Sequence, residues 1–402
     1  MNTYSNPQAS HSGPLLPLAG LRVLDFAQFL AGPSCALRLA DMGADVIKVE
    51  RPQGGDLCRQ LALADQRRGD DSALFHTINR NKRSFAADLK DPADLEQVRA
   101  LVASADVMIH NFRPGVMERI GLDWDTVRAA NPRLVYGTVT GYGTEGPWKD
   151  KPGQDLLVQS LSGMAWLSGN GGESAAPVPL GVSAVDLMTG AQLLQGILAL
   201  LVRRGVTNEG GRVEVSLLES ALDMQFEPFT VFLNGGGTPQ RSINNHANPH
   251  IGAPYGIFRT ADGFLTLAMT PVDALASLLG ASALETAAAN KASWYSERDK
   301  LKALLQDHLR GNTTAHWLGV LEPAGIWCAD VLGYPQLLEH GGFKVLDMVQ
   351  SLEMEDGQSL RTTRCPIRID EQLLRSSRPA PRLGAHNAEI LRELGLAKKD
   401  SA

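Results

Sequence analysis

The chain has 402 residues, of which 44% are apolar and 20% are charged, and its formal net charge is −6. This length predicts about two or three domains with an ample core, and the composition is typical of a globular enzyme. The negative charge argues against general nucleic-acid binding and against a polybasic membrane anchor.

The cysteines and the N-terminus indicate the compartment. The four cysteines are scattered and form no C-x-x-C pair, so neither a zinc site nor a disulfide framework is expected, and a reducing cytoplasm fits best. We expect no apolar run long enough to span a membrane, and residues 1–16 lack the features of a signal peptide. We therefore expect a cytoplasmic protein with no membrane partner and no bound metal.

Strand-like and helix-like patterns alternate over the first part of the chain. Such alternation over about 120 residues predicts a parallel, Rossmann-like sheet. The loop after the first predicted strand is not a G-x-G-x-x-G fingerprint, and the chain has no Walker phosphate loop, so an NAD enzyme or an NTPase is not expected. Strands are expected at 21–26, 45–50, near 89, 106–111 and 133–140, and helices at 34–42, 91–105 and 122–130.

The composition changes after the glycine-rich break at 234–239. Two antiparallel strands (255–258 and 264–269) and helical patterns up to about residue 321 predict a second, smaller α+β domain. Strand-like patterns return at 326–331, 343–349 and 361–369. We expect a mobile tail (1–17), a large domain (18–202), a linker (203–224), a small domain (225–321), and a return linker that completes the large domain (322–402).

Asp186 stands near the start of a long apolar segment, Pro179–Leu201. Apolar residues recur there at helical spacing and fill most of the opposite face as well, which predicts a helix buried on nearly all sides. The free N–H groups at the start of a helix and the helix dipole both favour an anion. Asp186 is therefore either a simple N-cap, or a carboxylate that is held ionised and acts as a nucleophile.

An ordered set of short motifs covers nearly the whole chain from residue 18. The motifs are LRVLDF (21–26), AGP (31–33), ADMGADVIKVERP (40–52), GGD (54–56), NKRS (81–84), DLK (88–90), NFRPG (111–115), NPRLVYG (131–137), GYGTEGP (141–147), the Asp186 segment and LGAHNAEIL (383–391). Together they resemble the class III CoA-transferases, the family of formyl-CoA transferase and carnitine CoA-transferase. The resemblance implies a Rossmann-like large domain with a smaller domain, an interlocked ring-like homodimer, and Asp186 as the nucleophile.

The implied chemistry suits an aspartate. A carboxylate that attacks a thioester forms a mixed anhydride, which is about as activated as the thioester, and releases the CoA thiolate. A serine nucleophile would form a more stable ester and stall the exchange. We therefore expect CoA transfer from an acyl-CoA to a free carboxylic acid through an aspartyl anhydride and an aspartyl-CoA thioester. CoA is a co-substrate, no cofactor is permanently bound, and the helix N-terminus keeps Asp186 ionised.

The resemblance also implies residues that bind CoA. An alternative for the three cations in this set is that they are solvated surface charges. Most of the set lies at or just beyond predicted strand ends, where open α/β sheets bind ligands, and this favours binding for Arg51 and Asn111 in particular. The implied residues are Gln28, Phe29, Arg51, Lys90, Asn111, Phe112 and Arg119.

The chain departs from the family pattern at the substrate pocket. Leu30 stands where formyl-CoA transferase has a glutamine near the reacting groups. Gln154, which directly precedes Asp155, occupies a position where relatives often have an aromatic residue. Leu30, Gln154 and Asp155 are the candidate pocket residues. Only composition makes the glycines at 235–237 a candidate flap, and HANPH (246–250) is interpreted as a polar loop and not as a metal site.

Two other functions remain open at this point. The α-methylacyl-CoA racemases share the implied fold and the aspartate, and a non-catalytic CoA-binding protein would use Asp186 only as a cap. A racemase needs a base on each side of the reacting carbon. Its second base is a histidine at the position of Gln154, and a glutamine cannot accept a proton at neutral pH. We therefore expect transfer and not racemisation.

Overall fold

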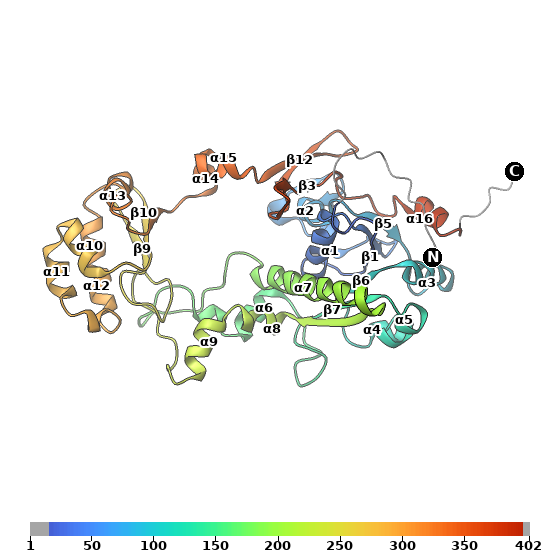
Figure 1. Cartoon of the computed structure of the whole chain (residues 1–402), viewed down its shortest axis with the longest axis horizontal. Coiled ribbons are helices and arrows are strands. Elements are labelled where there is room, and N and C mark those ends of the chain that lie inside the picture. Colours follow the sequence, from blue (N-terminus) through green and yellow to red (C-terminus); the bar gives the residue numbers. More distant parts are fainter. Residues whose placement is uncertain (1–15, 397–402) are drawn as a thin grey trace. The chain divides into compact units, whose positions relative to one another are not determined.

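The structure is a computed structural model that describes residues 16–396 (Figure 1). Its contacts divide the chain into two compact units. Unit 1 contains the chain up to Asp155, Ala184–Ser220 and the chain from Leu346 onward, and unit 2 contains Leu156–Ser183 and Ala221–Val345. Unit 2 is thus larger than the small domain expected over 225–321. Residues 1–15 of the expected tail lie outside the described residues.

Unit 1 is built on a six-stranded sheet with the order β5-β2-β1-β6-β7-β8. All neighbouring strands are parallel, with Leu24 of β1 opposite both Ile47 and Met108. This confirms the predicted parallel sheet of a mixed α/β fold. The strands are β1 (Arg22–Asp25), β2 (Asp45–Glu50), β5 (Arg83–Ala86), β6 (Val107–His110), β7 (Val135–Thr140) and β8 (Gly211–Ser216).

Helices cover both faces of this sheet. Successive side chains of a strand point to opposite faces, so apolar side chains on both faces need a covering layer. On one face Leu24 and Met108 share a core cluster with Leu101 of α3 (Pro92–Ser104) and Val127 of α5 (Trp124–Ala130). On the other face α1 (Ala31–Asp41) packs against β1 and β2, and α7 (Ala184–Thr207) packs against β7 and β8. Coverage of both faces explains why every residue of β6 is buried.

The C-terminal part of the chain returns to unit 1 and covers the outer edge of the sheet. The side chain of Asn387, in α16 (Asn387–Glu393), donates to the carbonyl of Ala86 and accepts from its N–H, both at 2.8 Å, as a neighbouring strand would.

The strand expected at 343–349 is wrong, since α15 (Gly341–Leu346) is a helix there. The other elements of unit 1 are β3 (Arg67–Arg68), β4 (Asp71–Ser72), α2 (Ala73–Asn79), α4 (Val116–Ile120), β12 (Val349–Glu353), β13 (Ser359–Thr363), β14 (Arg368–Ile369) and β15 (Gln372–Leu373), and α6 (Asp155–Leu161) and α8 (Leu217–Asp223) cross between the units.

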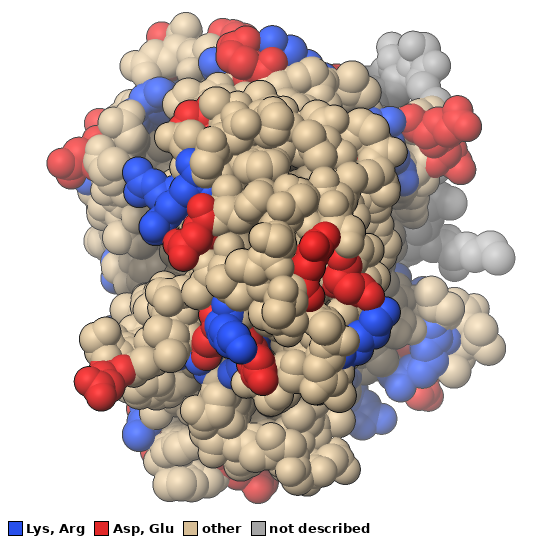
Figure 2. All heavy atoms as spheres, turned by 90° about the vertical axis from the view of Figure 1, so that its left-hand side faces the viewer, with Lys and Arg blue, Asp and Glu red and all other residues tan. Residues whose placement is uncertain are grey.

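Unit 2 has an antiparallel sheet, β11-β10-β9, with a core that includes Phe258, Leu265 and Leu305. The predicted hairpin is confirmed, because β9 and β10 pair antiparallel. On the face drawn in Figure 2, Lys and Arg lie interspersed with Asp and Glu, and most of the surface is uncharged. The elements are α9 (Phe226–Leu233), β9 (Gly256–Arg259), β10 (Phe264–Leu267), α10 (Val272–Leu279), α11 (Ser282–Ala288), α12 (Arg298–Leu309), α13 (Thr314–Leu321), β11 (Cys328–Asp330) and α14 (Tyr334–Glu339).

Helix α7 corrects several expectations. It continues to Thr207 and is followed at once by β8 of the main sheet, so the first part of the expected linker, 203–216, is regular structure. Val185, Leu193 and Ile197 are buried, whereas Val206 is 88% exposed, so the helix is not buried on nearly all sides. With 24 residues and a mean hydropathy of 1.6, α7 is also long and apolar enough to cross a membrane by length and composition alone. Its contacts with β7 and β8 place it against the sheet of unit 1.

Candidate active site

The carboxyl ends of the parallel strands meet at one edge of the sheet in unit 1, where open α/β sheets bind ligands. The segments that follow β1, β2, β5 and β6 carry every residue that the resemblance assigns to CoA. These four strands are neighbours in the sheet. The tertiary structure therefore gathers at one edge residues that lie up to 91 positions apart, from Gln28 to Arg119.

Side chains from other segments hold the loop after β1 through hydrogen bonds to its backbone groups. The side chain of Asn111 accepts from the N–H of Gln28 and donates to its carbonyl, both at 2.8 Å. The N–H of Phe29 donates to Asp56 (3.2 Å), and the Lys48 ammonium donates to the carbonyl of Ala27 (2.8 Å). Sequence reasoning gave no role to Lys48 or Asp56, although both lie within motifs quoted for the resemblance.

The three predicted cations lie on the surface. Arg51, Lys90 and Arg119 are all exposed, and within residues 16–396 none of them forms an ion pair. The Nε of Arg51 donates to the carbonyl of Gly55 (3.0 Å), and Arg119 lies over Gly115, where an added Cβ would be 3.3 Å from its Nη1. Exposed cations at this edge of the sheet are available to an anionic ligand.

The predicted aromatic residue after β6 has a buried neighbour. The ring of Phe112 stacks on His110, with ring centres 6.1 Å apart. The Nε2 of His110 lies 3.2 Å from the hydroxyl of Thr138, and burial, helped by Arg212, lowers the pKa of His110 to about 4. His110 is therefore neutral at physiological pH, and Phe112 rests on an uncharged ring.

Asp186 is the third residue of α7, which begins at Ala184, so it is not the N-cap of the helix. Instead, the buried Asp155 caps the helix from a distant segment, because its Oδ2 accepts from the N–H of Asp186 at 3.0 Å. A carboxylate oxygen at a free N–H of the first turn satisfies a group that has no partner within the helix. Asp155 therefore fixes the turn that carries Asp186.

A close contact between helices sets the direction in which Asp186 faces. An added Cβ on Gly190 would lie 2.1 Å from the hydroxyl of Ser34 and 2.6 Å from the carbonyl of Ala31, so only glycine lets α7 approach the first turn of α1 this closely. Asp186 lies four residues before Gly190 and therefore on the same face of the helix, one turn earlier. This places Asp186 on the side of α7 that faces α1 and the loop before it.

A pair of glycines in close contact positions Asp155. An added Cβ on Gly153 would lie 2.5 Å from the Cα of Gly141, and the converse distance is 2.7 Å. Gly141 directly follows β7, so this backbone contact holds the start of α6 at the carboxyl end of that strand. Asp155 thereby reaches the same edge of the sheet as the CoA-binding candidates.

The protonation of Asp186 differs from expectation. Burial and, second, the nearby Asp155 carboxylate raise the pKa of Asp186 to about 7. Burial and the like charge of Asp155 thus act against the ionisation that the helix N-terminus was expected to favour. A carboxyl group with a pKa near 7 is only about half ionised at neutral pH.

The other two candidate pocket residues differ in exposure. Leu30 packs against a buried cluster that includes Cys58 and Phe75, so its side chain contributes to the core. Gln154 is exposed and directly precedes α6. Within residues 16–396, no group of three or more His, Cys, Asp or Glu is arranged to hold a metal ion.

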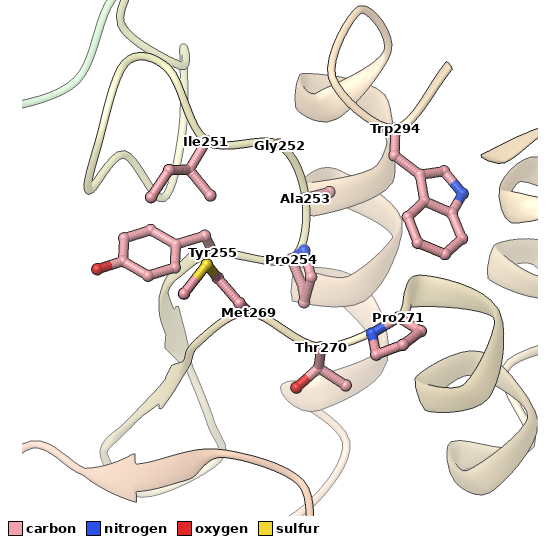
Figure 3. A pocket seen from close by; sticks show the side chains of 9 residues that line it. All are labelled: Ile251, Gly252, Ala253, Pro254, Tyr255, Met269, Thr270, Pro271 and Trp294. Atoms are coloured by element: carbon pink, nitrogen blue, oxygen red, sulfur yellow. The ribbon is translucent and has the colours of Figure 1, made fainter. Parts of the chain in front are cut away.

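The predicted polar loop of unit 2 is held by hydrogen bonds. The Nδ1 of His246 accepts from the N–H of Ser242 (3.1 Å), and its Nε2 lies 2.9 Å from the carbonyl of Leu167. Just beyond this loop, a cavity of about 300 Å³ has a mostly apolar wall without charged residues (Figure 3). Its lining residues are Ile251, Gly252, Ala253, Pro254, Tyr255, Met269, Thr270, Pro271 and Trp294, none of which was predicted as a site residue.

Comparison with known proteins connects this geometry to a family. A family model described as CoA-transferase family III matches residues 18–387. The succinate–glutarate CoA-transferase of Agrobacterium fabrum is 35% identical, over 94% of this chain and 96% of its own length. The succinyl-CoA:mesaconate CoA-transferase of Haloarcula hispanica is 31% identical, over 94% and 96%.

A solved structure agrees with the sequence comparisons. The crystal structure of Rv3272 from M. tuberculosis, a protein named as a probable fatty acyl-CoA transferase, has a TM-score of 0.82 and 31% identity, and the match covers 94% of this chain and 100% of that one. Both the sequence over nearly its whole length and the fold therefore show that this chain belongs to CoA-transferase family III and is an enzyme of that class.

Proposed function

We propose that the chain moves CoA from an acyl-CoA to a free carboxylic acid, with the Asp186 carboxylate as the nucleophile. The observation that carries this proposal is the position of Asp186. It lies in the first turn of α7, is fixed there by Asp155, and faces the loop at the ligand-binding edge of the sheet. A carboxylate placed beside a CoA site is suited to attack a thioester.

The proposed reaction proceeds through covalent intermediates on Asp186. The carboxylate attacks the thioester carbonyl, the C–S bond breaks, and a mixed anhydride and CoA thiolate form. The thiolate attacks the aspartyl carbonyl, releases the donor acid and leaves an aspartyl-CoA thioester. The acceptor carboxylate attacks this thioester and expels the thiolate, which then attacks the acceptor carbonyl of the new anhydride. Acyl-CoA of the acceptor leaves, and the Asp186 carboxylate is regenerated.

CoA is proposed to bind at the edge of the sheet in unit 1. Arg51, Lys90 and Arg119 would neutralise its phosphates, since they are exposed cations without carboxylate partners among residues 16–396. Phe29 and Phe112 offer aromatic faces on which a purine base can stack. Gln28 and Asn111 join the segments that carry these groups.

The acids are proposed to be short dicarboxylic acids. The relatives from Agrobacterium fabrum and Haloarcula hispanica are named for succinate, glutarate and mesaconate, and the structural relative is named for fatty acyl groups. The test is a matrix of succinyl-CoA and medium-chain acyl-CoA donors against dicarboxylic and fatty acid acceptors. We expect turnover with succinyl-CoA and a dicarboxylate. An enzyme that is active only with fatty acids would contradict this substrate class but not the transfer mechanism.

Incubation of a 2-methylacyl-CoA in deuterated water separates transfer from racemisation. Without an acceptor acid we expect no deuterium at the 2-position, because Gln154 cannot serve as the second base. Addition of a carboxylate should then start CoA transfer. Mass spectrometry and chiral analysis of the thioester provide the measurements. Steady uptake of deuterium with loss of optical purity would overturn the transferase proposal.

An interlocked homodimer is proposed from exposed apolar helices in each unit. In unit 2, α9 has no buried residue, and its Leu233 is 65% exposed. Tyr334 in α14 is 81% exposed, and in unit 1 the outer face of α7 carries exposed valines. Large apolar side chains exposed on several helices are typical of a protein interface. The free thiols Cys35, Cys58, Cys328 and Cys365 support our inference of a cytoplasmic location.

Light scattering coupled to gel filtration should give the mass of a dimer at micromolar concentration. Replacing Phe226 and Leu233 by aspartate should shift the protein toward a monomer or to aggregates, because a charge in an apolar interface is not compensated. Asp223→Asn, just before α9, is a nearby control that removes a charge. A stable, active monomer of the unchanged chain would contradict the interlocked dimer.

A further inference from the structure

We propose that Lys48 and Asp56 are positioning residues for CoA: their buried ion pair fixes the loop 27–29 so that Phe29 presents its ring at the ligand-binding edge of the sheet. This inference rests on the proposed CoA-transfer function. The two side chains are buried, and the Nζ of Lys48 lies 2.8 Å from the Oδ2 of Asp56. Both are one step removed from the ligand, since they act through the backbone of the loop.

Every hydrogen bond of this loop ends on a buried or half-buried side chain. The N–H of Ala27 donates to Asp25 (3.0 Å), and its carbonyl accepts from Lys48 (2.8 Å). Asn111 pairs with both backbone groups of Gln28, and the Oδ1 of Asp56 accepts from the N–H of Phe29 (3.2 Å). The surroundings thus hold five of the six backbone N–H and C=O groups of residues 27–29, which permits a conformation that the loop would not adopt alone.

Phe29 adopts such a conformation. Its φ is 64°, in the left-handed region that a residue with a Cβ rarely occupies, and its side chain is 44% exposed. A strained backbone that leaves a large apolar ring in solvent gives the folded chain no benefit by itself. Strained residues of this kind cluster at ligand sites, where the strain is part of preorganisation.

The buried ion pair itself also supports a positioning role. Burial alone would lower the pKa of Lys48, but Asp25, Asp56 and Glu50 raise it, so the ammonium stays charged. Two charges taken out of water are weak evidence for stability, because desolvation offsets their attraction. The pair has a specific geometric effect. The Lys48 ammonium donates to the carbonyl of Ala27 and pairs with Asp56, and Asp56 in turn accepts from the N–H of Phe29.

Asp56→Asn tests this role. The neutral amide keeps an oxygen for the N–H of Phe29 but loses the pair with Lys48, so the loop loses its fixed conformation. We expect the folded variant to bind CoA, measured by isothermal titration calorimetry, on the order of tenfold more weakly, with an unchanged KM for the acceptor acid. Asp123→Asn is the matched control, because Asp56 and Asp123 each accept from a backbone N–H at the start of a helix, that of Cys58 at 2.9 Å and that of Thr126 at 3.1 Å. It should bind CoA as the unchanged chain does.

Substitutions at Phe29 keep the test independent of the buried pair. Phe29→Gly and Phe29→Ala both remove the ring and should weaken CoA binding. The glycine variant should melt at a higher temperature than the alanine variant, since only glycine adopts this φ without strain. In the Phe29→Gly background, Asp56→Asn should have no further effect on CoA binding, because residues that act through one another are not additive.

The outcomes separate the two proposals. If the unchanged chain does not bind CoA, the proposed function and this role both fail. If the unchanged chain binds CoA and the folded Asp56→Asn variant binds it equally well, the positioning role alone is overturned. The same holds if Asp56→Asn weakens binding equally with phenylalanine and with glycine at position 29. A purely structural Asp56 would lower the melting temperature without such coupling.

Discussion

Replacing Asp186 by alanine should lower the rate of CoA transfer by on the order of a thousandfold or more, while the chain still folds. The physical reason is that the substitution removes the atom that attacks the thioester, and no other carboxylate of the first turn of α7 replaces it. The measurement is the rate of acceptor-CoA formation. Hydroxylamine added with acyl-CoA should inactivate the unchanged chain by trapping the activated carboxylate, but should not modify the variant.

Asp186→Asn is the isosteric control for folding. Because the pKa of Asp186 is raised to about 7, ionisation of this group disfavours the folded state as the pH rises from about 4 to about 7. Asparagine has no such charge, so the variant should be at least as stable as the unchanged chain at neutral pH and equally inactive in transfer. A folded Asp186→Ala or Asp186→Asn variant with full activity would end the proposed mechanism.

Replacing Asp155 by asparagine should shift the pH dependence of transfer to lower pH. In the unchanged chain kcat/KM should fall below a pH of about 7, where Asp186 becomes protonated, and at about pH 5 only on the order of 1% of the plateau should remain. Removal of the negative charge of Asp155 lowers the pKa of Asp186, so the ionised nucleophile persists further into acid. Burial, which is the larger cause of the shift, remains and keeps the pKa above its ordinary value.

The matched variant for this prediction is Asp155→Ala. An asparagine oxygen can still accept from the N–H of Asp186, whereas alanine removes the cap as well, at a cost of about 1 kcal/mol in the free energy of unfolding. We expect Asp155→Ala to show the same shift of the acid limb with lower stability and a lower plateau. Identical acid limbs in the unchanged chain and in both variants would show that Asp155 does not control the ionisation of Asp186.

Local pattern determined much of the fold. The strand-like patterns predicted β1, β2, β5, β6 and β7 of the parallel sheet, and β2 occupies the expected residues, 45–50. The glycine-rich break and the antiparallel pattern predicted the hairpin of unit 2. These features depend on side-chain periodicity over a few residues, which is a property of the sequence itself. The ordered motifs likewise identified the family, and the resemblance made Asp186 the expected nucleophile.

The tertiary structure decided how that aspartate is held and how acidic it is. Its cap is Asp155, 31 residues earlier, and its direction depends on Gly190 and the first turn of α1. Its pKa depends on burial and on a like charge, and neither quantity has a local signature in the chain. The exposed face of α7 was not predicted for the same reason. The sequence of an apolar helix does not say which of its faces packs against the sheet, and only the tertiary structure determines this. The sequence identifies the carboxyl group of Asp186, but contacts between distant segments of the chain set the electrostatic environment of that group.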